Sequence, residues 1–209
     1  MLKKLTLLAL SVGALLAFAA PAQAANPLLT NDLGEPAPTY ITATSSNTIT
    51  HTSAGTLECT TVELTLHITE NTNNKASGHG TGKAEGTVPA KTHTGHCGSS
   101  SGAVVEITNV TVSNISLEKV GAETKGTAGF SFTYDLRSAT GAGLLAECTF
   151  GTTAENKVEV TKTGTHTIKI HGNIVKTAGG AFCPSGGSIT GDFTLEEDVP
   201  VSPRPIHIH

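Results

Sequence analysis

The sequence predicts an all-β fold, in the form of an antiparallel β-sandwich-like unit. Three observations predict it. First, 34 of the 209 residues are threonine, while only 4% are aromatic and 14% charged; β-branched residues suit a pleated, half-exposed surface. Second, apolar and polar residues alternate with a period of two in several segments after residue 39. Third, helical periodicity never persists beyond about two turns after the N-terminal segment.

Residues 1–24 carry the three parts of a secretory signal peptide. Lys3 and Lys4 give a basic start, Leu5–Ala20 is an uncharged and mostly apolar run, and Ala22-Gln23-Ala24 is a small-x-small cleavage site. The apolar run is shorter than the roughly 20 residues that a membrane span needs. We therefore expect cleavage after residue 24 and secretion from a bacterial cell, with a retained N-terminal anchor as the alternative.

The mature chain would have 185 residues, with 11 basic and 17 acidic side chains and a net charge of −6. The basic residues do not cluster. A nucleic-acid or anionic-membrane partner is disfavoured, because both require a basic patch. No later segment is long and apolar enough to span a membrane. We expect an extracellular partner and no transmembrane segment once the signal is removed.

The next segment, residues 25–38, contains Pro27, Pro36 and Pro38 and is expected to be a linker. A β domain then covers residues 39–200, and a Pro/His tail covers residues 201–209.

The strongest strand signal is the alternation of Phe130, Phe132, Tyr134 and Leu136 with polar residues. The same pattern predicts further strands, with a change of face and hence a bulge in the second: 62–68, 105–112, 144–150, 168–174 and 189–195. Hairpin turns are expected at 71–74 and at 163–164 because of their Asn, Thr and Gly content.

Four cysteines in an exported chain favour two disulfides, for which three connectivities are possible. A weak internal duplication narrows the choice. Glu-Cys-Thr occurs at both Cys59 and Cys148, and a Gly/Ser-rich turn follows both Cys97 and Cys183. We therefore favour Cys59–Cys97 and Cys148–Cys183, each closing one pseudo-repeat, at about 39–117 and 127–200. The repeats would form one sandwich or two small domains, and the single sandwich is preferred.

With its signal peptide, Thr/Gly-rich mature chain and paired cysteine strands, the sequence resembles uncharacterised secreted β-rich proteins of high-GC Gram-positive bacteria. The resemblance covers most of the mature chain. It implies a secreted disulfide-containing β fold and no particular activity.

Nine histidines make metal binding the first chemical hypothesis, because imidazole is the commonest metal ligand. His93 and His96 precede Cys97, and His207 and His209 end the chain. Together they are candidate ligands for zinc or copper. The alternative is that they are exposed polar residues on strands and on a tail, since no acidic ligand lies close to them in sequence.

A nucleophile elbow is the first catalytic hypothesis, because residues 98–102 have the Gly-x-Ser-x-Gly spacing. A strand-like segment follows where that motif needs a helix, so we interpret it as a turn. No cofactor-binding motif is found. The sequence favours a non-catalytic extracellular interaction or structural module. The alternatives are an exported zinc- or copper-binding protein and an extracellular hydrolase whose site is assembled from distant residues.

Overall fold

The computed structural model describes residues 27–53, 55–59, 62–74, 81–91, 96–99, 104–138, 140, 143–199 and 202–209. Within these ranges every strand pair is antiparallel, which confirms the predicted all-β class. The strands, in chain order, are β1 (Leu29–Thr30), β2 (Tyr40–Ser45), β3 (Thr48–Thr52), β4 (Gly55–Cys59), β5 (Val62–Asn74), β6 (Thr81–Lys91), β7 (His96–Ser99), β8 (Val104–Val120), β9 (Glu123–Arg137), β10 (Leu144–Gly151), β11 (Val158–Lys162), β12 (Thr167–Gly179), β13 (Gly186–Glu197) and β14 (His207–Ile208).

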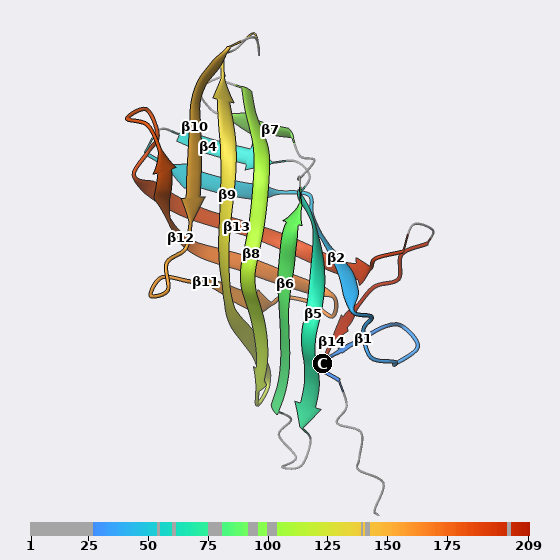
Figure 1. Ribbon diagram of the computed structural model, residues 1–209. Coiled ribbons are helices and arrows are strands. Elements are labelled where there is room, and N and C mark those ends of the chain that lie inside the picture. The colour runs from blue at the N-terminus through green and yellow to red at the C-terminus, as the bar shows by residue number, and fades with distance from the viewer. Residues whose placement is uncertain are drawn as a thin grey trace, which may run out of the picture.

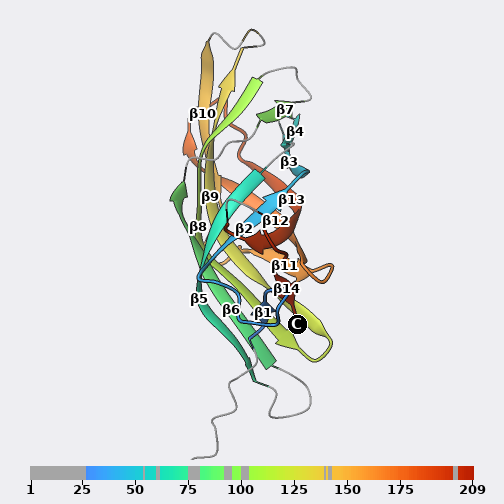
Figure 2. The same ribbon diagram turned by 90° about the vertical axis from the view of Figure 1, so that its right-hand side faces the viewer.

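Two layers make up the sandwich. One layer contains β10, β9, β8, β6 and β5. The strands of the other layer, among them β12 and β13, run across behind it (Figure 1). Figure 2 shows the two layers from the side. Hydrogen bonds also join the layers at their margins, because β2 pairs with both β5 and β13, β11 with both β9 and β12, and β7 with both β4 and β8. Twelve of the described strands therefore form one sheet that closes on itself.

The order of strand pairing occurs twice. β9 pairs with β8 along its length, with β11 through its first half and with β10 through its second half. In the first half, β2 and β3 together take the place of β9. Both pair with β13, as β9 pairs with β8. β2 pairs with β5, as β9 pairs with β11, and β3 pairs with β4, as β9 pairs with β10. The last strand of each half, β8 or β13, thus pairs with the first strand of the other. The two halves interlock within one sandwich.

The two predicted disulfides are confirmed. Cys59 on β4 and Cys97 on β7 are direct cross-strand partners, and their sulfur atoms are bonded. Cys148 on β10 is bonded to Cys183, which lies in the turn between β12 and β13. All four cysteines are buried, so each disulfide is also part of the apolar interior.

The expected bulge is present, because the register of β8 against β9 shifts between Ile107 and Asn109. The turn at 163–164 is also confirmed, since it joins β11 to β12. The prediction of a turn at 71–74 was wrong, because these residues continue β5 and pair with β6. Asn71 accepts a hydrogen bond from the Leu29 amide (2.9 Å) and donates one to the Leu29 carbonyl (2.8 Å). Its side chain serves as a strand partner, which explains an asparagine here.

Three aromatic rings stack across β9 and β10 in the interior. Phe150, which is fully buried, lies 5.4 Å from Tyr134 and 5.9 Å from Phe132 between ring centroids. Burying a side chain of this size contributes about 2–3 kcal/mol. Burial also raises the pKa of the Tyr134 hydroxyl above its ordinary value. Phe182, in contrast, is 83% exposed in the turn after β12. The neighbouring Cys183 is buried, and its disulfide attaches that turn to β10.

The segments expected as linker and tail pair with each other through β1 and β14. Ile206 and Ile208 of the C-terminal segment and Leu28 and Leu29 of the N-terminal segment are buried. These four side chains belong to the hydrophobic core, and Figure 1 shows β1 and β14 beside the marked C-terminus.

Candidate functional site

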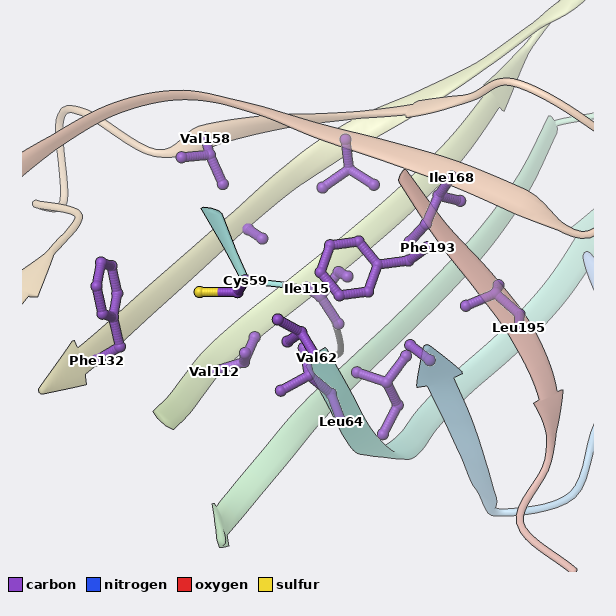
Figure 3. Packing of buried hydrophobic residues seen from close by; sticks show 14 of the residues in the cluster. Cys59, Val62, Leu64, Val112, Ile115, Phe132, Val158, Ile168, Phe193 and Leu195 are labelled. Carbon is purple, nitrogen blue, oxygen red and sulfur yellow. The ribbon is translucent and has the colours of Figure 1, made fainter. Parts of the chain in front are cut away.

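An apolar cavity of about 80 Å³ lies between the two layers in the part of the chain that the structure describes. Its wall is built from both layers, and Figure 3 shows Phe193 of β13 pointing toward Ile115 of β8. Other lining residues come from β2, β3, β5, β9 and β12, among them Ala43, Thr50, Leu64, Ala128, Phe132 and Ile168.

Small residues at inward-facing strand positions leave this space open. Ala43 and Ala128 line the cavity with small side chains. Gly191 instead makes room for its neighbours, since a Cβ there would lie 2.9 Å from Thr48 Oγ1 and 3.1 Å from Phe193 Cε2. The chain has no tryptophan, and its phenylalanines are too few to reach every part of the interior. Protein interiors are normally packed to crystal-like density. A void of this size therefore departs from the normal packing of a protein interior and distinguishes this part of the core.

The chemistry available in the cavity is limited. Its described lining consists of aliphatic and aromatic side chains, Gly191, the disulfide-bonded Cys59, and the hydroxyl-bearing Thr48 and Thr50. None of these groups titrates near neutral pH. A hydrolytic site needs at least two convergent acid, base or nucleophilic groups, and this lining offers none. The arrangement suits binding of an apolar body.

The candidate metal ligands lie in different places. His93 is outside the described residues. The backbone of His96 is in β7, where it pairs with Glu106 of β8. His207 and His209 belong to the β14 segment, and β7 and β14 lie toward opposite ends of the molecule in both views (Figures 1 and 2). The structure therefore does not bring His96 together with His207 and His209. Among the described side chains, no group of three or more metal-ligating residues occurs.

His207 and His209 instead join the two ends of the chain. The Nε2 atom of His207 lies 2.6 Å from Oδ1 of Asp32, and Nε2 of His209 lies 2.7 Å from the Thr30 hydroxyl. The Lys162 ammonium group donates a hydrogen bond to the Ile208 carbonyl. Desolvation, with a smaller contribution from the nearby Lys119, lowers the pKa of Lys162. These contacts give His207 and His209 a structural role, because they attach the β14 segment to the β1 segment.

Two buried carboxylates, Asp135 and Glu197, lie outside the cavity lining. Asp135 of β9 is 8% exposed, and its Oδ2 atom accepts a hydrogen bond from Arg137 at 3.2 Å. Neighbouring residues Tyr134 and Leu136 face the interior, so Asp135 faces outward from the layer. The pair with Arg137 balances its charge, and we assign it a structural role.

Sequence reasoning did not identify the cavity residues. The available signal was the occurrence of alanine or glycine at inward positions of otherwise bulky strands, as at Ala43, Ala128 and Gly191. That signal indicates space only after the layers are known to face each other there.

Comparison of the chain with protein families, with curated proteins and with solved structures finds no match. In the described residues, no helix has the length and hydropathy needed to cross a lipid bilayer. The two disulfides fit a protein of an oxidising, non-cytoplasmic compartment.

Proposed function

We propose that this chain is a secreted, non-catalytic binding protein that holds a small apolar ligand between its two layers. The observation that carries the proposal is the cavity of about 80 Å³ with its almost wholly apolar lining. An engineered cavity of about 150 Å³ lined by Leu, Ile and Phe stays dry and binds benzene or xenon. The present cavity has about half that volume, so by that comparison the ligand is smaller than benzene.

The architecture supports this role. The closed pairing of the strands and the two disulfides hold the layers at a fixed spacing, so the cavity exists before the ligand arrives. A preformed site saves the entropy of ordering the protein on binding. A secretory location is supported by the signal-peptide pattern of residues 1–24 and by the disulfides.

Xenon is the first probe, because it binds apolar cavities without hydrogen bonding. We expect xenon under pressure to shift NMR signals of cavity-lining methyl groups in the wild type. Val112→Ala enlarges the cavity and is expected to increase these shifts. Val160→Ala is the matched control, since Val160 is also buried but lies outside the lining. Absence of xenon-specific shifts in the wild type, or equal responses in the two variants, would contradict the proposal.

Export is tested separately by the intact mass of the protein recovered from culture medium. We expect a chain that begins at Ala25 and weighs four hydrogens less than its reduced form. A protein retained in the cells, or free thiols in the native state, would contradict the secreted assignment.

A further inference from the structure

Gly191 and Phe193 lie two residues apart on the inward face of β13, and both line the cavity. Residues at this spacing are neighbours on one face of a strand, because side chains alternate between the two faces. A Cβ atom at position 191 would lie 3.1 Å from Cε2, which is at the far edge of the Phe193 ring. The ring therefore leans back along its own strand and covers the glycine. The missing side chain of Gly191 gives the ring this place against the sheet.

Thr48 crowds the same position from the neighbouring strand. It is the cross-strand partner of Gly191, and its Oγ1 atom would lie 2.9 Å from the added Cβ. The Thr48 hydroxyl donates a hydrogen bond to Ser45 Oγ at 3.1 Å, and both side chains are buried. Moving Thr48 would break this bond, which is costly because neither group could turn to water instead. The apolar Phe193 ring is held by no such bond, so it is the side chain that would give way.

The space open to a displaced ring is the cavity itself. The backbone of β13 lies behind the ring, and Ile168 of β12 is the cross-strand partner of Phe193. Figure 3 shows the ring pointing toward Ile115 of the opposite layer. Both isoleucines line the cavity, so the empty volume of about 80 Å³ lies on the side away from β13. A side chain at position 191 would therefore move the ring into the cavity and reduce its volume.

We propose that Gly191 and Phe193 set the upper size limit of the ligand, and that the ligand is an uncharged hydrocarbon of about three or four carbon atoms. The size follows from proportion, because a cavity of about 150 Å³ binds benzene and this one has about half that volume. Apolar walls select by size and shape, and one methylene group changes affinity in such a pocket by about 10- to 200-fold. This inference rests on the proposed function, to which it adds two specificity-determining residues.

Cyclopropane and benzene test the size limit, because they differ in size while both are apolar. Their affinities are measured by NMR titration, and the wild type should bind cyclopropane and exclude benzene. Gly191→Ala should weaken cyclopropane binding by about tenfold or more, because the displaced ring occupies its space. Phe193→Leu, which has no atom equivalent to Cε2, should keep cyclopropane binding and raise the ratio of benzene to cyclopropane affinity. For the same reason, Gly191→Ala/Phe193→Leu should recover the cyclopropane binding that Gly191→Ala loses.

Gly172→Ala is the matched control. A Cβ atom there would lie 3.0 Å from Val158 Cα, so the substitution crowds a buried neighbour to a similar degree, but neither residue lines the cavity. Gly191→Ala and Gly172→Ala should both lower the denaturation midpoint, and only Gly191→Ala should weaken cyclopropane binding. Equal loss of binding in the two variants would show a general effect of crowding and would refute the role of Gly191.

The remaining outcomes separate this inference from the proposed function. If the wild type binds cyclopropane and Gly191→Ala binds it equally well, or if Phe193→Leu leaves the affinity ratio unchanged, the size-limiting roles are refuted while the binding cavity stands. Wild-type protein that binds xenon but not cyclopropane, or that binds benzene as tightly as cyclopropane, refutes the ligand class. If xenon and both hydrocarbons fail to bind the wild type, the proposed function fails and this inference fails with it.

Discussion

Filling the cavity should stabilise the protein, and Ala128→Leu is the substitution that tests this most directly. Ala128 is 2% exposed on β9, lines the cavity, and pairs with Ile115 on one side and Val158 on the other. Empty cavity volume destabilises a core by about 24 cal/mol per Å³. For a cavity of about 80 Å³ this corresponds to about 2 kcal/mol, which is the most that complete filling could return. A leucine fills part of the space, so we expect a gain of about 1 kcal/mol.

Urea denaturation measures this gain. With a denaturant dependence of about 1–3 kcal/mol per molar, the midpoint should rise by about 0.3–1 M at unchanged slope. Ala84→Leu is the comparison, because Ala84 is also a buried strand alanine but borders a gap of only about 20 Å³. Overpacking there should cost about 1–3 kcal/mol. If Ala128→Leu lowers the midpoint as Ala84→Leu does, the cavity is too small to accept a leucine and our reasoning about the site is refuted.

Three further predictions concern stability. Replacing Cys148 and Cys183 with alanine should lower the free energy of unfolding by about 4 kcal/mol, the chain-entropy value for a loop of this length, as measured by urea denaturation; an unchanged midpoint would contradict it. Because burial raises the pKa of Tyr134, the folded state favours the neutral hydroxyl, and stability should fall as pH rises from about 10 through the folded pKa. Tyr134→Phe should lose this fall, and parallel slopes for the two proteins between pH 9 and 11 would refute the assignment. Ile208→Ala should cost about 2–5 kcal/mol in the same denaturation assay, whereas a cost near zero would show that the β14 segment does not contribute to the core.

The fold class and the disulfide pairing could be predicted from sequence because both depend on local patterns. Alternation along Phe130–Leu136 specifies a strand with one buried face, and the repeated Glu-Cys-Thr around Cys59 and Cys148 indicates which cysteines pair. Asn71 was misassigned as part of a turn because its role depends on Leu29, a residue far away in sequence. An asparagine amide forms the same kind of hydrogen bond to the backbone in a local turn and in pairing with a distant strand. The sequence alone therefore does not distinguish the two cases.

The cavity could not be predicted for a related reason. Alternation assigns Ala128 and Ala43 to the inward face but does not say what lies opposite them. That depends on how far the layers are apart and on which strands cross, and both are set by pairing between distant strands such as β2 and β13.

The interlocking of the two halves determines when the molecule can fold. β2 and β3 pair with β5 and β4 on one edge, but their other edge pairs only with β13. The Thr30 side chain likewise pairs with His209, 179 residues away along the chain. No N-terminal portion can close the sheet while the C-terminal strands are still being made, and pairing over such distances is intrinsically slow. We therefore expect this topology to delay complete folding until the whole polypeptide is available.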